Sequence, residues 1–182
     1  EPVLLDDMLH KHQAQDIRLG LKDELPEAVQ NVVDDTATSI LQHINNAAVI
    51  NPIALMSLIL LHTPAHALAE HELLAHIEDY QNLLRDSQYD ARMVMTELSP
   101  EEIIAYALKM KQVQRQQQDG VNMIAVQTHQ HVLLSYFNHN ILHSMMLPAW
   151  IAQVLTQQQS LTLHELKQHL TAFYPFLKQV LF

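Results

Sequence analysis

The chain has 182 residues, 48% of them apolar, and a formal net charge of −10 at pH 7. That apolar content is enough for a well-packed core and excludes an intrinsically disordered chain. The chain contains no cysteine, which excludes disulfides, thiol nucleophiles and thiolate metal sites and fits a reducing compartment. It opens on Glu1 without an apolar signal segment, so we expect a piece of a longer protein.

The charge is concentrated in the first two thirds of the chain. Residues 1–119 carry 8 basic and 19 acidic side chains, whereas residues 120–182 carry two basic and one acidic. No Lys or Arg lies between Lys22 and Arg85, so there is no basic stripe. We therefore expect no nucleic-acid partner, and an anionic lipid surface would repel this part. The weakly charged last third should be buried or covered by a partner.

The expected fold is mainly α, a bundle of about seven to nine helices. Two glycines and 5% aromatic residues are too few for a β-sandwich or barrel, which needs frequent glycine turns. A short segment lies at 3–12, and the first long helix is predicted from about Pro26 to Asn45. Pro52 opens an apolar helix that Pro64 closes. A second amphipathic helix follows, with an apolar face of Leu73, Ile77, Tyr80 and Leu84.

The middle of the chain carries two strong local signals. Ser99-Pro100-Glu101-Glu102 is a capping box with proline at the first helical position, so a helix is predicted to begin there. Asp119-Gly120 separates Val113–Gln117 from Val121–Val126 and has the sequence of a tight turn between two strands. We therefore predict one β-hairpin near 113–126, and we find no second strand signal of comparable strength.

Helices are again expected after the hairpin. One is predicted over 130–147, and Pro148 is expected to start the next. Thr162 and Glu165 form a second capping box, which predicts the start of a last helix. Pro175 should end or kink that helix.

Two segments of the chain resemble each other at a constant offset, residues 68–80 and 161–173. Two related helix-turn-helix units would produce this similarity, and so would two amphipathic helices that solve the same packing problem. We divide the chain into a helical unit over 26–126, which ends in the hairpin, and a second helical unit over 127–182.

No residue set in the sequence predicts a catalytic, metal or cofactor site. His71 and His76 are five residues apart, about 140° round a helix, whereas two zinc ligands on one helix face are normally four apart. His139 and His143 have that spacing but no acidic third ligand nearby. No Gly-x-Ser-x-Gly elbow and no glycine-rich phosphate loop occurs, so we predict no nucleophile, metal or cofactor.

The block Ser135–Asn140, followed by Ile141-Leu142-His143 and Leu147-Pro148, resembles a block of the bacterial membrane-associated glycerol-3-phosphate acyltransferases. That block reads Thr-Tyr-Tyr-Arg-Asn-Asn, an aliphatic pair, His and then Leu-Pro. Other blocks agree in order: His43–Ala47, Pro52, Leu83–Arg85 with Tyr89, Tyr174–Leu177 and Leu181–Phe182. The resemblance marks as family-motif residues, with an expected structural role, Asn45, Asn46, Tyr136, Phe137, Asn140, His143, Pro148, Tyr174 and Pro175.

The resemblance implies a parent enzyme that starts phospholipid synthesis. It would move an acyl group from acyl carrier protein or coenzyme A to the first hydroxyl of glycerol 3-phosphate, at the cytoplasmic face of the bacterial inner membrane. The family's catalytic His-x4-Asp motif does not occur in this chain. The resemblance therefore implies a non-catalytic helical portion that braces an upstream acyltransferase domain, with 1–25 as the linker and 127–182 truncated at its C-terminus.

The resemblance is broken at two positions and leaves two questions open. The family's Arg is replaced by Asn138, and one Asn by His139. Tyr136, Asn140 and His143 should share one helix face, and they either reach the catalytic domain or its ligand, or bond to neighbouring helices. The alternative function is a stand-alone winged-helix-like protein-interaction module, because residues 52–126 combine three predicted helices with a hairpin.

Overall fold

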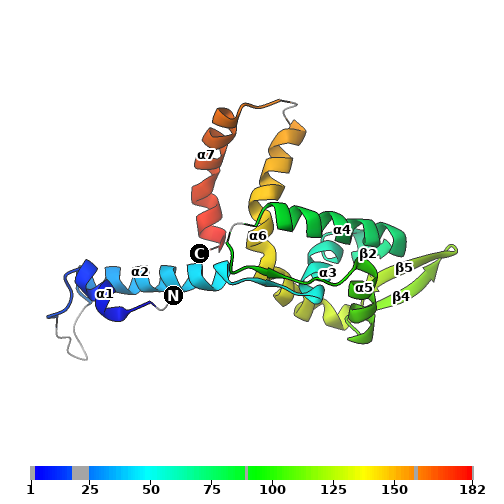
Figure 1. The fold of residues 1–182 in the computed structure, drawn as a ribbon, viewed down its shortest axis with the longest axis horizontal. Coiled ribbons are helices and arrows are strands. Elements are labelled where there is room, and N and C mark those ends of the chain that lie inside the picture. The colour runs from blue at the N-terminus through cyan, green and yellow to red at the C-terminus, as the bar shows by residue number, and fades with distance from the viewer. Residues whose placement is uncertain (1–2, 18–24, 89, 158–159, 182) are drawn as a thin grey trace.

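A computed structural model describes residues 3–17, 25–88, 90–157 and 160–181 (Figure 1). Helices dominate this described part, which confirms the mainly α prediction, and its seven α-helices fall within the predicted number. The helices are α1 (Leu5–Lys11), α2 (Glu27–Asn46), α3 (Pro52–Leu60), α4 (Glu70–Asp86), α5 (Pro100–Lys109), α6 (His131–Gln157) and α7 (Leu163–Leu181). The strands are β1 (Val49–Ile50), β2 (Ala67–Ala69), β3 (Val94–Met95), β4 (Val113–Gln118) and β5 (Val121–Val126). Two short 3-10 turns lie at Pro64–His66 and Thr128–Gln130.

Helix α3 is the centre of the hydrophobic core. The Asn51 side chain accepts a hydrogen bond from the Ala54 backbone N–H at 2.9 Å, and Pro52 occupies the first turn, so the helix begins where the sequence predicts. Every residue from Ile53 to Leu60 is buried. The neighbouring helices cover α3 with buried side chains that include Leu73, Ile77, Leu84, Ile103, Leu134 and Ile141.

Apart from the short strand β3, residues 52–126 have the winged-helix order of elements: a helix (α3), a strand (β2), two helices (α4 and α5) and a hairpin (β4–β5). The hairpin β4–β5 is confirmed, and Asp119 (φ 51°) and Gly120 (φ 81°) both adopt the left-handed conformation of a type I′ turn. The capping box at Ser99 is also confirmed, with both of its hydrogen bonds present. Strand β2 pairs antiparallel with β5, so the sheet order is β2-β5-β4. Strand β2 thus adds a third strand to the predicted hairpin.

A second pair of strands lies outside that sheet. Strands β1 and β3 run parallel, with Val49 opposite Val94 and Ile50 opposite Met95. Backbone hydrogen bonds join Val94 N to Ala48 O at 3.0 Å and Thr96 N to Ile50 O at 2.9 Å. This pairing fixes the segment after α4 beside the segment that follows α2.

The predicted helix start at Pro148 is wrong, because α6 continues from His131 through Pro148 to Gln157. A proline inside a helix removes one backbone hydrogen bond, here the one that the Ser144 carbonyl would accept, and packing of the helix offsets this cost. Leu134, Ile141 and Met145 join the same core cluster as α3. Helix α7 likewise continues through Pro175. Pro175 therefore does not end the helix, and a kink at this residue stays a prediction.

The second half of α6 and α7 form a hairpin that projects from the body of the molecule (Figure 1). The predicted capping box begins α7, with Thr162 N bonded to Glu165 Oε2 at 2.8 Å and Glu165 N to Thr162 Oγ1 at 3.3 Å. The rings of Trp150 and Phe173 stack at 6.2 Å between the two helices.

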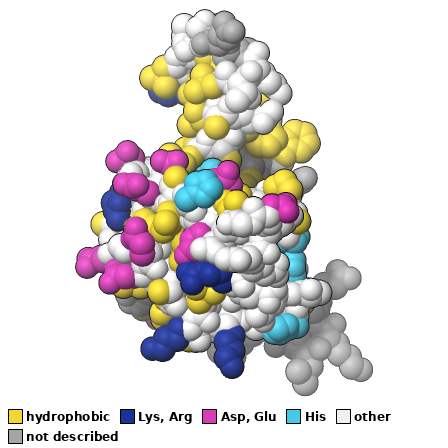
Figure 2. Space-filling model, turned by 90° about the vertical axis from the view of Figure 1, so that its right-hand side faces the viewer, with side chains coloured by type: hydrophobic (Ala, Val, Ile, Leu, Met, Phe, Trp, Pro, Cys, Tyr) yellow, Lys and Arg dark blue, Asp and Glu magenta, His cyan; other side chains and the backbone are white. Residues whose placement is uncertain are grey.

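The weakly charged last third of the chain, residues 120–182, leaves several large apolar side chains exposed. Leu163, Tyr174 and Phe176 keep 68%, 56% and 64% of their surfaces exposed. Figure 2 shows acidic side chains gathered over the body, whereas the projecting part is mostly apolar or uncharged. The prediction that these side chains are buried within the chain is therefore wrong. The alternative, that a partner covers them, stays a prediction. Among the described helices, none has the length and apolar content that crossing a membrane requires.

Candidate functional site at the junction of α2 and α6

The structure joins two of the blocks that carry the resemblance. His143 on α6 lies against the last turn of α2, with its Nε2 at 3.1 Å from the carbonyl oxygen of Asn45, 98 residues away in sequence. A carbonyl oxygen only accepts hydrogen bonds, so Nε2 carries the proton. His143 therefore holds the end of α2 on the middle of α6.

Burial favours the neutral form of His143. It lowers the pKa of His143 from its ordinary value, and the hydrogen bond to the Asn45 carbonyl opposes that shift only in part. A neutral imidazole with its proton on Nε2 has an acceptor at Nδ1. The side chain thus acts as a fixed donor toward α2, and its charge state suits a structural hydrogen bond.

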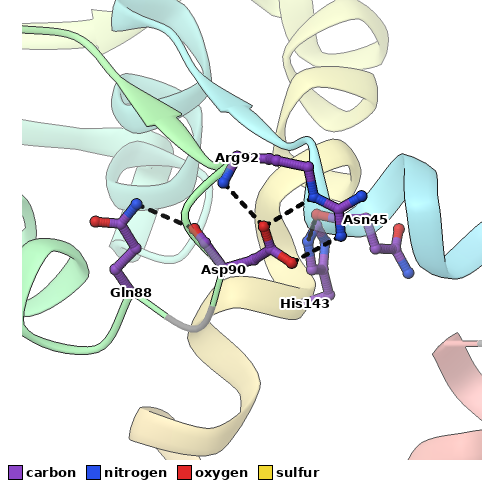
Figure 3. A network of polar contacts seen from close by, with 5 residues as sticks. All are labelled: Asn45, Gln88, Asp90, Arg92 and His143. Carbon is purple, nitrogen blue, oxygen red and sulfur yellow. Dashed lines mark hydrogen bonds and ion pairs between the residues drawn. The ribbon is translucent and has the colours of Figure 1, made fainter. Parts of the chain in front are cut away.

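An ion pair lies beside this contact (Figure 3). The Asp90 carboxylate accepts hydrogen bonds from the Arg92 backbone N–H, Nε and Nη2 at 2.8, 2.9 and 2.8 Å. These bonds lower the pKa of Asp90 from 3.8 to about 2. Gln88 Nε2 donates to the carbonyl oxygens of Asp90 and Met93 at 3.0 and 3.1 Å, so the loop is held on both sides of the ion pair.

The strand register explains why Arg92 reaches the junction. Val49 pairs with Val94 in parallel, so the residue two positions before Val94 lies level with Ala47, just past the end of α2. The C-terminal end of a helix carries partial negative charge, which a nearby guanidinium stabilises. Figure 3 shows the Arg92 side chain near Asn45 and His143.

A cleft of about 410 Å³ opens at the same junction. Its walls combine apolar side chains with amides and one imidazole, and they come from α2, the β1 segment, α3 and α6. The lining residues are Ile44, Asn45, Ala47, Ala48, Val49, Asn51, Ala54, Phe137, His139 and Asn140. None of the described lining residues carries a carboxylate, so this lining favours an apolar group or a peptide segment over a cation.

The junction gathers only part of the predicted set. Asn45, Phe137, Asn140 and His143 meet there, and Asn46 is the last residue of α2. Tyr136 is 63% exposed and contacts Phe137 edge to face at 5.9 Å. Pro148, Tyr174 and Pro175 line no part of the cleft and lie in the second half of α6 and in α7.

Sequence reasoning missed Gln88, Asp90 and Arg92. The only signal was Asp90-x-Arg92, a spacing at which a carboxylate in a loop can accept from the backbone and side chain of the second following residue. The resemblance pointed to the neighbouring Tyr89, which lies outside the described residues. In the part of the chain that the structure describes, no group of three or more His, Asp or Glu could hold a metal ion.

Asn138, which stands where the resemblance has Arg, is expected to destabilise the fold. The side chain is only 6% exposed, and its Oδ1 has no hydrogen-bond partner among the described residues. Because a buried polar atom without a partner costs free energy, Asn138→Leu should raise the free energy of unfolding by about 1 kcal/mol. Denaturant titration measures the change, and Asn140→Leu, at an exposed position on the same helix, is the control. A loss of stability in Asn138→Leu would show that the amide has a partner.

Comparisons with known proteins give the same family as the resemblance. The family model described as the glycerol-3-phosphate acyltransferase C-terminal region matches residues 1–182. A glycerol-3-phosphate acyltransferase of Xanthomonas campestris pv. campestris is 36% identical over 183 residues, covering 100% of this chain and 21% of the relative. One of Xylella fastidiosa is 34% identical with the same coverage.

The chain thus spans about one fifth of the length of the curated relatives it matches. No solved structure matches the chain. Because the family model covers the whole chain, this chain belongs to the family of the glycerol-3-phosphate acyltransferase C-terminal region.

Proposed function

We propose that the chain is the non-catalytic helical region of an enzyme that acylates the first hydroxyl of glycerol 3-phosphate. The acyl donor is an acyl carrier protein or coenzyme A thioester, and the parent enzyme works peripherally at the cytoplasmic face of the bacterial inner membrane. The observation that carries the proposal is the family match over all 182 residues, together with relatives named as glycerol-3-phosphate acyltransferases.

The proposed role within that enzyme is to brace the acyltransferase domain. No histidine in the sequence is followed by aspartate five positions later, so the chain lacks the His-x4-Asp arrangement of a general base. The family-motif residues at the junction instead make structural contacts, since His143 bonds to a backbone carbonyl and Phe137 packs against the core. These contacts support a rigid surface whose shape matters to a neighbouring domain.

The purified chain is expected to have no acyltransferase activity, because it lacks that motif. The measurement is release of free coenzyme A from acyl-coenzyme A in the presence of glycerol 3-phosphate, with the full-length enzyme as the positive control. Boiled chain gives the background. Turnover by the chain above that background would refute the proposal that this region is non-catalytic.

A second candidate function rests on the sheet order β2-β5-β4 and the helices that precede the hairpin. This winged-helix arrangement favours a protein-interaction module, in which α5 would be the recognition helix. Glu101 and Glu102 are exposed at its start, so its partner would be a protein and not DNA. The sequence upstream of Glu1 in the native reading frame separates the two functions. A His-x4-Asp motif in that sequence supports the acyltransferase, and its absence supports the stand-alone module.

A further inference from the structure

Helix α2 carries an apolar stripe on its outer side. The stripe consists of Val33, Ala37, Ile40, Leu41 and Ile44, which follow one another at helical spacing. All five are exposed, and Val33, Ile40 and Ile44 keep 51%, 46% and 61% of their surfaces accessible. At 1.5 Å and 100° per residue the stripe is about 16 Å long and about 100° wide.

The stripe faces away from α1, the helix that packs on the outer part of α2. The side that α1 covers carries Val32, which is 4% exposed, and Asp35. Asp35 Oδ2 accepts from Lys11 Nζ at 2.5 Å and lies 2.8 Å from His12 Nε2. Figure 1 shows α2 extending from the body with α1 near its outer end. The fold therefore uses one side of α2 and leaves a second apolar side uncovered by the described residues.

The stripe is continuous with the cleft at the junction. Ile44 belongs to both, and the cleft continues beyond it to Asn45, Phe137 and Asn140. The amide of Asn140 is on an exposed residue, so it can donate to and accept from a peptide backbone that enters the cleft. An apolar stripe that ends in a cleft with amide groups matches the usual composition of a protein interface, an apolar centre with polar groups at the rim.

Charge and chain length decide what covers this surface. Residues 23–84 contain no Lys or Arg, and Asp34 flanks the stripe, so an anionic lipid surface would be repelled. A second copy would bring two acidic flanks together. In the relatives about four fifths of the length lies outside the match. The matching family model is described as the C-terminal region, so most of that length is expected to precede the match.

We propose that the α2 stripe and the junction cleft form one docking surface for the acyltransferase segment that precedes this region in the parent enzyme. The proposal rests on the proposed function and specifies which face of the region the preceding segment contacts. The docking segment should present an apolar face with basic residues beside Asp34. The experiment must distinguish this segment from two other possible partners of the surface, a membrane and a second copy of the chain.

The test is site-specific photo-crosslinking in the full-length enzyme. The photoreactive amino acid p-benzoylphenylalanine replaces Ile40 in the stripe or, as the matched control, Gln42, which is exposed about 160° round the same helix. Position 40 is expected to give several times more cross-linked product than position 42. Mass spectrometry should find the partner peptide in the segment that precedes Glu1. Cross-links from position 40 to a second copy or to lipid, or equal yields at both positions, would overturn the proposal.

Acyltransferase activity of the same preparation separates this proposal from the proposed function. If the enzyme acylates glycerol 3-phosphate but gives no intramolecular cross-link from position 40, the proposed docking surface is refuted and the proposed function is still supported. A full-length protein with the specific cross-link but without acyltransferase activity supports the docking surface and contradicts the function. The two failures are therefore distinguishable in one experiment.

Discussion

Leu55→Ala is expected to lower the free energy of unfolding by about 2–5 kcal/mol, the range for a fully buried leucine that leaves a cavity. Leu55 is 0% exposed and lies in the middle of α3, a helix whose residues from Ile53 to Leu60 are all buried. The helices around α3 pack on it directly, so the surroundings have little room to collapse into the space. Guanidinium or urea titration of the chain, followed by circular dichroism, measures the change.

Leu133→Ala is the matched control, because Leu133 is 41% exposed on α6. Truncation there removes little buried surface, and we expect a loss of less than about 1 kcal/mol. Similar losses in the two variants would contradict the position of α3 at the centre of the core.

The helices that the sequence predicts are those with strong local signals. Asn51-Pro52 and Ser99-Pro100 supply a capping side chain and a proline for the first turn, and the helices begin there. Asp119-Gly120 supplies the two left-handed residues of the hairpin turn. In each case a few adjacent residues determine the local backbone, so no knowledge of the rest of the fold is needed.

The strands β1, β2 and β3 were missed because their pairing depends on distant segments. Strand β2 is Ala-Leu-Ala, which has no β-branched residue, and it is a strand because β5 lies beside it. Strands β1 and β3 are two residues each and pair across 45 residues of sequence. The predicted helix start at Pro148 was wrong for the same reason. Packing on α3 and α7 keeps α6 continuous where local preference predicts a break.

The site was predictable in part. The resemblance marked Asn45, Asn140 and His143, and the structure brings all three to one junction. It did not reveal that the partner of His143 is a backbone carbonyl, because a carbonyl occurs at every residue and has no sequence signature. The ion pair of Asp90 and Arg92 was missed because its place beside α2 follows from the β1–β3 register.

His143→Ala in the full-length enzyme is expected to destabilise the protein and to lower activity through that loss. The change removes a half-buried side chain and the hydrogen bond to Asn45, which together predict a loss of about 1–3 kcal/mol. His143→Gln is the matched control, since its amide can also donate to the carbonyl. We expect its melting temperature to lie between those of the wild type and His143→Ala.

The Michaelis constant for glycerol 3-phosphate in His143→Ala tests the central claim most directly, that this region supports catalysis without touching the substrate. It is measured on the folded fraction, below the melting temperature of the variant. We expect a lowered melting temperature with a Michaelis constant close to that of the wild type. An unchanged melting temperature with a strongly raised Michaelis constant would contradict it and would place α6 at the substrate site.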